Sequence, residues 1–350
     1  MTEMIAAEPA LAERLITRLA DDEATRTLAD WLAEAVVTSD PIEVFGCGTS
    51  EHAAEGAAEI WTDALRDRWP HPVRHRQALD VIGRPTRGIG IGISHEGGTA
   101  ITNAALAAVR DGGGRTALIT VSGRSPGAAI ADLVIATEEQ DQSWCHTVGY
   151  LSPILAAAAV GAAIAERPLD TGAVRALLAA DTAEDAEAIG RACAEARHVI
   201  VAGAGADHAN ARELALKIAE GAHLPTIALD LETVLHGHLA AADPAARLIV
   251  VGTDDAGQVV DRTRAVVDAA RAIGIPAAAI LTEPVAATLT EATTPAGRIV
   301  VGTDRSIPPA VARLIAPVTP MQLVAERLAR ARHVNPDTLG REEPRQATAQ

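Results

Sequence analysis

Apolar residues recur at intervals of three or four over residues 8–38, for example at Leu11, Leu15 and Leu19. This spacing places them on one face of a helix, so it predicts a helix or a helical hairpin. Beyond Pro41 the pattern changes to short apolar runs, each followed by a stretch with helical spacing. Such alternation predicts an α/β fold with a mostly parallel, doubly wound sheet and helices on both of its faces.

The strand–helix pattern occurs twice along the chain. The strands expected in the first copy lie at 42–45, 88–93, 116–121 and 133–136. Those expected in the second copy lie at 199–202, 248–251, 276–281 and 299–301. The offset between the copies is about 160 residues, and four strands recurring in order at one offset indicate an internal repeat. We therefore expect N-terminal helices at 1–38, one α/β domain at 39–168, a second at 173–332 and a polar tail at 333–350.

A glycine-rich loop follows the first strand of each copy. Gly46 and Gly48 lie in the first loop, and Gly203 and Gly205 stand 157 residues later. Loops at this end of parallel strands bind ligands in doubly wound proteins, because helix N-termini there present free N–H groups. Both loops lack the third glycine of the dinucleotide fingerprint, which counts against a nicotinamide dehydrogenase.

Hydroxyl groups are concentrated in two loops of the first copy. Thr49 and Ser50 follow the first glycine pair, and Ser94 and Thr99 flank the loop after the second strand. For either loop alone, helix capping is the ordinary role of these side chains. The two loops together, with glycines that allow the backbone to approach a ligand, favour a cradle for an anion or for sugar hydroxyls.

The composition limits the partners of the protein. Its formal net charge of −16 repels nucleic acids and anionic membranes. No apolar run reaches the roughly 20 residues of a membrane span, so we expect neither a nucleic-acid partner nor a membrane. The 3 cysteines form no Cys-x-x-Cys pair and the N-terminus lacks signal-peptide features, which predicts a cytoplasmic protein. Aromatic residues make up 2% of the chain, so a sugar would be held by polar loops and not by stacked rings.

Lys217 is the only lysine of the chain, and Glu220 follows it by one helical turn. The two side chains therefore share a helix face, and an ordinary surface ion pair is the simplest interpretation of the residues alone. His236 and His238 are two residues apart and point in different directions. No set of carboxylates and histidines with ligand spacing surrounds them, so we expect no metal site.

These motifs resemble those of the SIS (sugar isomerase) family. Its tandem-domain members include the isomerase half of glucosamine-6-phosphate synthase and related amino-sugar phosphate deaminases and deglycases. Gly46-Cys47-Gly48-Thr49-Ser50 is similar to the first loop of the family, and Ser94-His95-Glu96-Gly97-Gly98-Thr99 to its phosphate loop. Lys217-Ile218-Ala219-Glu220 is similar to its Lys-x-x-Glu, and His236-Gly237 to its His-Gly. The resemblance implies two tandem, flavodoxin-like SIS domains.

The resemblance implies an enzyme that interconverts an aldose and a ketose, with a sugar or sugar phosphate as its ligand and no cofactor. Deamination or deglycation of an amino sugar as a coupled reaction is left open. Glu220 is implied as the base that moves a proton between C2 and C1, and Lys217 as the group that holds an oxyanion or orients Glu220. His236 is implied as the ring-opening group, and it reaches the site from a second subunit in the family, which implies a homodimer. The implied substrate contacts are Gly48, Thr49, Ser50, Ser94, His95, Glu96, Thr99 and Ser143.

The chain departs from the family pattern in two places. Glu96 stands where the family has a phosphate-binding serine, and two like charges in contact at a partly buried site cost on the order of several kcal/mol. Either Glu96 turns away or the ligand there is not a phosphate. The tail after Asn335-Pro336-Asp337 lacks the terminal lysine of the family, and Arg341 or Arg345 could replace its charge but could not donate a proton.

A non-catalytic regulatory protein that binds a sugar phosphate is the alternative function. Such a protein has no need of a base, an orienting lysine and a ring-opening imidazole. The presence of Glu220, Lys217 and His236 together therefore favours the enzyme.

Overall fold

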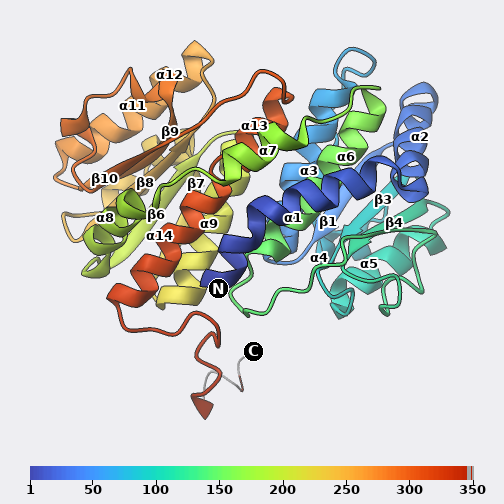
Figure 1. The fold of residues 1–350 in the computed structure, drawn as a ribbon, viewed down its shortest axis with the longest axis horizontal. Helices are drawn as coiled ribbons and strands as arrows, with labels where there is room; N and C mark the ends of the chain where they lie inside the picture. The colour runs from blue at the N-terminus through green and yellow to red at the C-terminus, as the bar shows by residue number, and fades with distance from the viewer. Residues whose placement is uncertain (345–347, 349–350) are drawn as a thin grey trace.

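The computed structural model describes residues 1–344 and residue 348, so Arg345 lies outside the described part of the chain. Two parallel five-stranded sheets stand side by side, and helices cover both faces of each (Figure 1). The predicted α/β class, with two doubly wound domains in tandem, is confirmed.

The strand order is the same in the two sheets. The first sheet has the order β2-β1-β3-β4-β5, and the second has the order β7-β6-β8-β9-β10. The strands of the first are β1 (Ile42–Gly46), β2 (Arg74–Gln77), β3 (Ile89–Ile93), β4 (Arg115–Thr120) and β5 (Leu133–Ala136). Those of the second are β6 (His198–Gly203), β7 (Thr226–Asp230), β8 (Ala246–Gly252), β9 (Ala277–Thr282) and β10 (Gly297–Val301). The internal repeat is therefore a repeat of topology as well as of sequence pattern.

The helices follow the strands in alternation. In the first half they are α1 (Thr2–Ala20), α2 (Glu23–Thr38), α3 (Thr49–Leu65), α4 (Ala78–Gly83), α5 (Ala100–Asp111) and α6 (Val148–Ile164). In the second half they are α7 (Thr171–Leu178), α8 (Ala183–Ala194), α9 (Ala206–Ala222), α10 (Leu231–Leu235), α11 (Gly257–Ala272), α12 (Glu283–Ala286), α13 (Pro309–Ile315) and α14 (Val318–Ala331). Short 3-10 helices occupy His238–Ala241 and Glu291–Thr293. Within the described residues no helix is both long and apolar enough to cross a bilayer.

Two edge strands, β2 and β7, are absent from the sequence prediction. The sequence of β2 is Arg-His-Arg-Gln, and three of its four side chains are exposed. β7 likewise pairs with a neighbour on one side only and has a single buried residue. An edge strand can be short and polar because only one of its edges is paired, so neither strand produces the apolar run that marks the central strands.

The glycine pairs of the two copies have the same conformation and the same packing. Gly48 has φ 56° and ψ −129°, and Gly205 has φ 55° and ψ −127°. Residues with a Cβ rarely adopt this region. A Cβ on Gly46 would lie 2.6 Å from the carbonyl carbon of Ser50, and one on Gly203 would lie 2.4 Å from the carbonyl oxygen of Asp207. The turn from strand to helix thus requires both glycines in each copy.

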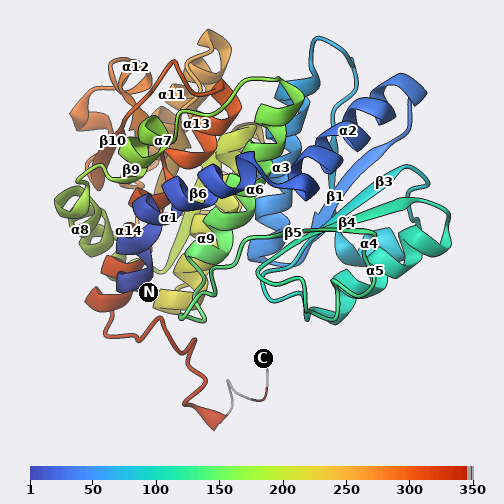
Figure 2. The same cartoon turned by 45° about the vertical axis from the view of Figure 1, so that its right-hand side comes forward.

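A shared core joins the two halves. One cluster of buried apolar residues extends from Leu15 on α1 through Leu151 on α6 to Leu314 on α13. α3, α6 and α9 lie between the two sheets in both views (Figure 2), and α3 packs directly against α9. α1 crosses the front of both halves and contacts α6, α7 and α14. Asp22 begins α2, where its side chain accepts a hydrogen bond from the N–H of Thr25.

Candidate active site

A cleft of about 510 Å³ lies where the loops after β1 and β3 face the end of α9. Its lining residues come from the first copy, from the second copy and from the tail. They are Cys47, Gly48, Thr49, Ser50, His95, Glu96, Gly98, Thr99, Trp144, His146, Glu220 and Leu339. Seven of the predicted site residues therefore meet at one cleft, and Ser94 and Lys217 lie directly behind it.

The hydroxyl groups of these loops do not cap their helices. Gly48, which has no side chain, is the N-cap of α3, and the N-cap residue Thr99 makes no capping hydrogen bond to α5. Instead Thr49 Oγ1 donates to Glu213 Oε1 at 3.1 Å, and Ser94 Oγ donates to Thr99 Oγ1 at 3.3 Å. Helix capping therefore does not explain the hydroxyls of Thr49 and Thr99.

The loop after β3 presents unpaired backbone donors. The N–H groups of Glu96, Gly98 and Thr99 make no hydrogen bond to any described residue. Gly97 between them has a φ of +66°, and a Cβ there would lie 2.1 Å from Ser125 Oγ, so the turn requires glycine. Free N–H groups ahead of a helix attract anions, and this loop is therefore suited to a phosphate or a carboxylate.

Glu96 is exposed at the rim of the cleft. Its Oε1 accepts a hydrogen bond from Gln140 Nε2 at 2.9 Å. Gln140 precedes α6, so this bond holds the carboxylate of Glu96 to the loop between β5 and α6.

Lys217 is fully buried, whereas Glu220 reaches the cleft. The exposed fractions of their side chains are 1% and 26%, and Nζ of Lys217 lies 2.6 Å from Oε2 of Glu220. Burial alone would lower the pKa of Lys217, but the carboxylates of Glu213 and Glu220 together with Cys145 raise it above its ordinary value. Lys217 is thus a permanently charged group that fixes Glu220, and the interpretation as a surface ion pair is wrong.

Glu213 is a site residue that the sequence did not reveal. Its side chain is completely buried, and its Oε1 lies 3.5 Å from Lys217 Nζ. His52 Nδ1 donates to Oε2 at 2.7 Å, which joins α3 to α9. Burial raises the pKa of Glu213, but Lys217 and His52 outweigh that effect and hold it below its ordinary value. The only sequence signal was its position four residues before Lys217, on the same helix face.

Two imidazoles stand in the cleft beside this pair. The ring centroids of His95 and His146 are 4.9 Å apart in an edge-to-face arrangement, and His95 Nε2 accepts a hydrogen bond from the N–H of Asp141 at 3.0 Å. Burial lowers the pKa of His95 to about 4, and burial together with Lys217 lowers the pKa of His146. Both rings are therefore neutral at pH 7. Of the two, sequence reasoning found only His95.

His236 and Ser143 do not line the cleft. His236 directly follows α10, and its side chain is 74% exposed. Its Nε2 lies 3.3 Å from Oε2 of Glu232, in the first turn of the same helix. A contribution of His236 from a second subunit stays a prediction. Ser143 is buried, and its N–H donates to Asp141 Oδ1 at 3.1 Å, which orders the loop ahead of α6.

The tail packs beside the cleft. Leu339 belongs to the lining, and the N–H of Trp144 donates to the carbonyl of Asp337 at 3.2 Å. The guanidinium of Arg341 lies 3.6 Å from the ring centroid of Trp144. The N-terminal amine of Met1 pairs with the carboxylate of Asp337. The tail is thus an ordered wall of the site as far as the structure describes it.

The second copy fills the corresponding position with its own carboxylate. Asp207 follows Gly205 as Ser50 follows Gly48. Its carboxylate accepts hydrogen bonds from the N–H of Thr253 at 2.7 Å, from Thr253 Oγ1 at 2.5 Å and from the N–H of Asp254 at 3.3 Å. Burial raises the pKa of Asp207 to about 6, although these bonds lower it in part. The equivalent loop of the second copy therefore already holds an anion, whereas the loop of the first copy is open.

Metal ligands are not gathered at the site. In the part of the chain that the structure describes, no group of three or more His, Cys, Asp or Glu side chains is arranged to hold a metal ion.

No family model and no curated protein matches the sequence. Similar solved structures include the C-terminal domain of glucosamine-fructose-6-phosphate aminotransferase from Francisella tularensis. It has a TM-score of 0.83 and 18% identity over 96% of this chain and 97% of that one. Tagatose-6-phosphate ketose/aldose isomerase from Escherichia coli has a TM-score of 0.74 and 17% identity over 97% and 94% of the two chains. Glucosamine-6-phosphate deaminase from Thermotoga maritima has a TM-score of 0.64 and 18% identity over 94% and 97%.

These likenesses extend over nearly the whole length of the chains that are compared. They show the fold of the chain, which is the tandem SIS fold that these solved structures share. The resemblance predicted from the loop motifs is confirmed at this level.

Proposed function

We propose that the protein interconverts the aldose and ketose forms of a phosphorylated sugar. The observation that carries the proposal is the pair of buried Lys217 and partly exposed Glu220. Its carboxylate faces a cleft bordered by the unpaired N–H groups of Glu96, Gly98 and Thr99. Similar structures include a ketose/aldose isomerase and a deaminase of sugar 6-phosphates, which supports this class of substrate.

The anionic end of the sugar is bound by the loop after β3. Its three free N–H groups and the hydroxyls of Ser50 and Thr99 are the donors, and anion binding of this kind needs no lysine or arginine. The hydrogen bond from Gln140 keeps the charge of Glu96 at the rim. The phosphate therefore sits on the inner side of the loop, away from that carboxylate.

Glu220 is the base of the proposed reaction. It removes the C2 hydrogen as a proton, and the electrons of the C–H bond form a C1–C2 double bond while the C1 oxygen gains a proton. The proton on Glu220 exchanges with solvent, because the side chain is 26% exposed. Glu220 then donates a proton to C1, and the C2 hydroxyl loses one to become the carbonyl. Lys217 is the positioning residue, because its Nζ contacts Glu220 and is itself closed off from the cleft.

His146 is one of two imidazoles that the chain itself brings to this cleft, and the other, His95, already accepts a hydrogen bond from Asp141 at its Nε2. Ring opening requires that the anomeric hydroxyl loses a proton and that the ring oxygen gains one. A neutral imidazole has one donor and one acceptor nitrogen, so it can perform both transfers. His236 of a second copy remains the alternative donor, within the homodimer that we also propose. We assign the protein to the cytoplasm, where its free cysteines Cys47, Cys145 and Cys193 would stay reduced.

The test is a set of turnover assays followed by proton NMR, with fructose 6-phosphate, tagatose 6-phosphate and glucosamine 6-phosphate as substrates. We expect the wild type to isomerise at least one of them, and ammonia release from glucosamine 6-phosphate would add the coupled deamination. Glu220→Gln should lower kcat at least about a hundredfold, whereas Glu195→Gln, at the exposed end of α8, should leave it unchanged. Binding without turnover in the wild type would overturn the proposal and favour the regulatory alternative.

A further inference from the structure

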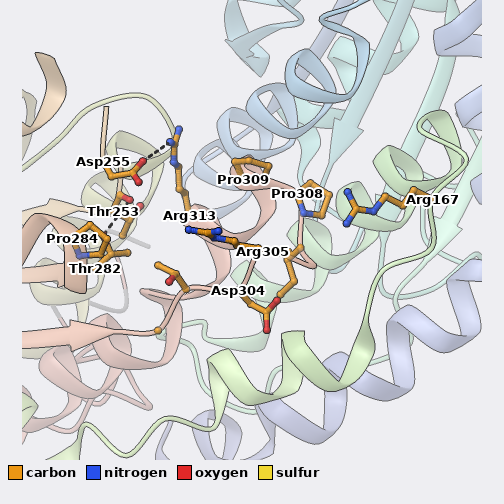
Figure 3. A pocket seen from close by; sticks show the side chains of 14 residues that line it. Arg167, Thr253, Asp255, Thr282, Pro284, Asp304, Arg305, Pro308, Pro309 and Arg313 are labelled. Carbon is orange, nitrogen blue, oxygen red and sulfur yellow. Dashed lines mark hydrogen bonds and ion pairs between the residues drawn. The ribbon is translucent and has the colours of Figure 1, made fainter. Parts of the chain in front are cut away.

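A second cavity, of about 360 Å³, lies at the carboxyl edge of the second sheet (Figure 3). On one side of it, Thr253 follows β8 and Thr282 is the last residue of β9. The loop after β10 contributes Thr303 and Arg305. Arg167 reaches it from the linker between the two halves. All of its walls come from the second copy and this linker, so the cavity is separate from the cleft of the first copy.

The position of the cavity follows from the internal repeat. Trp144 and His146 precede α6 and line the first cleft, and Arg305 and Ile307 precede α13 and line the second cavity. Each copy thus forms a hollow with the loop that enters the helix after its last strand. The chemistry differs, because the second copy has an arginine where the first has a tryptophan.

Every acidic group at the cavity already has a partner. Asp254 and Asp255 lie 2.8 and 3.6 Å from Nη2 of Arg313. Asp304 accepts hydrogen bonds from the N–H and Oγ of Ser306 at 2.7 and 2.6 Å, which lower its pKa. Its carboxylate is turned away from the centre of the cavity in Figure 3.

Two guanidinium groups remain without a carboxylate partner among the described residues. Arg167 donates only to the carbonyl of Ser306, at 3.2 Å, and Arg305 makes no hydrogen bond or ion pair with the described part of the chain. Figure 3 shows Arg305 extending across the cavity toward Arg313, while Arg167 lies on the opposite side, beyond Pro308. In a chain with a net charge of −16, two unneutralised arginines at one cavity mark a site for an anion.

We propose that this cavity binds a small phosphomonoester, such as a sugar phosphate, through the guanidinium groups of Arg167 and Arg305. The planar guanidinium fork matches the oxygens of a phosphate and gives paired, charge-assisted hydrogen bonds. The exposed hydroxyl of Thr303 is available to the organic part of the ligand, and the cavity volume lies in the range of small-molecule pockets.

Binding at this cavity also affects the contact between the halves. Arg167 belongs to the linker, whereas Arg305 belongs to the second copy, so a shared ligand ties the linker to the second sheet. α13, which follows the cavity loop, packs against α3 and α9. α9 carries Glu213 and Lys217, and α3 carries His52, which bonds to Glu213, so the ligand stabilises the arrangement on which the first cleft is built.

The test is isothermal titration calorimetry of the full chain with inorganic phosphate and with fructose 6-phosphate. We expect two binding sites in the wild type. The double variant Arg167→Ala/Arg305→Ala should weaken one site at least tenfold and leave the other unchanged. The affinity of Arg305→Lys at this site should lie between those of the wild type and the double variant, because lysine keeps the charge but lacks the guanidinium fork. Arg271→Ala, which removes an exposed arginine on α11 outside the cavity, is the matched control.

Equal stoichiometry and affinity in the double variant and the wild type would overturn the proposal. A uniform loss of affinity at both sites would do so too, since it would indicate a general charge effect. Both arginines are exposed, and far-ultraviolet circular dichroism verifies that the variants remain folded. The proposal is tested by the number and affinity of the binding sites, so the result does not depend on whether any sugar is isomerised.

Discussion

The carboxyl group of Glu8 should make the stability of the protein depend on pH. Glu8 is completely buried on α1, where its Oε2 accepts a hydrogen bond from Thr319 Oγ1 at 2.9 Å. Its Oε1 has no partner among the described atoms. Burial raises the pKa of Glu8 from 4.5 to about 8, and the side chains of Thr319 and Gln322 lower it only in part. The folded protein therefore holds Glu8 protonated at neutral pH, whereas the unfolded chain ionises it.

The sign and size of the effect follow from linkage. Because the pKa of Glu8 is higher in the folded state, its stabilising contribution is complete below the unfolded value near 4.5. It is lost as the pH rises from there toward 8. At pH 7 the loss is about 3 kcal/mol, from a separation of about 2.5 units at 1.36 kcal/mol per unit. Glu8→Gln removes the titration, and its new amide can donate to Gln322 Oε1, which has no partner in the described structure.

The assay is urea denaturation followed by circular dichroism at pH 5, 7 and 8. We expect the free energy of unfolding of Glu8→Gln to exceed that of the wild type by a margin that grows across this range, to on the order of 4 kcal/mol at pH 8. Glu3→Gln, an exposed substitution on the same helix, should follow the wild type. A margin that stays constant or shrinks between pH 5 and pH 8 would refute the reasoning.

Three further predictions concern the cleft. Gly97→Ala should weaken binding of fructose 6-phosphate at least tenfold in a thermal-shift titration, because its Cβ would collide with Ser125; Gly123→Ala, with nothing nearby, is the control, and equal affinities would contradict the loop geometry. Glu213→Gln should lower the free energy of unfolding by about 3 kcal/mol, since it removes one of the two carboxylates that neutralise the buried Lys217, and a loss under 1 kcal/mol in urea would count against this. His146→Gln should lower kcat at least about a hundredfold at unchanged KM, and full activity would reassign ring opening to His236.

The fold could be predicted from the sequence because its signals are local. Gly46 and Gly48 and their counterparts are required by turns only a few residues long, so they recur visibly at a fixed offset. The central strands are buried on both faces and therefore read as continuous apolar runs. β2 and β7 lie at sheet edges, where burial is incomplete, and gave no such run.

The site could be predicted only in part, because several of its contacts form only where α3 packs against α9. Thr49 and His52 meet Glu213 across more than 160 residues of chain, and no local pattern reports such a contact. His146 follows an irregular loop whose path is set by hydrogen bonds to Asp141. The contact between Lys217 and Glu220 could be predicted, because residues three apart on a helix lie on the same face.

The two copies contribute different groups to the cleft, and the difference follows from one position, which is Ser50 in the first copy and Asp207 in the second. The loop after β1 places Ser50 beside an open set of donors, whereas its counterpart places Asp207 on the donors of the second copy. One copy is thereby left free to bind an anionic ligand, and the other supplies α9 with Lys217 and Glu220. The first cleft is therefore lined by both copies, and each copy contributes a different kind of wall.

The central claim is that one carboxylate, Glu220, moves a proton between neighbouring carbons of the sugar. Its most direct test is isomerisation in deuterated water, with the product of the active sugar phosphate analysed by proton NMR. We predict that the wild-type product carries solvent deuterium at the carbon that gains hydrogen, and that Glu220→Gln gives neither product nor label. A product free of deuterium, or an unchanged rate of labelling by Glu220→Gln, would contradict the claim.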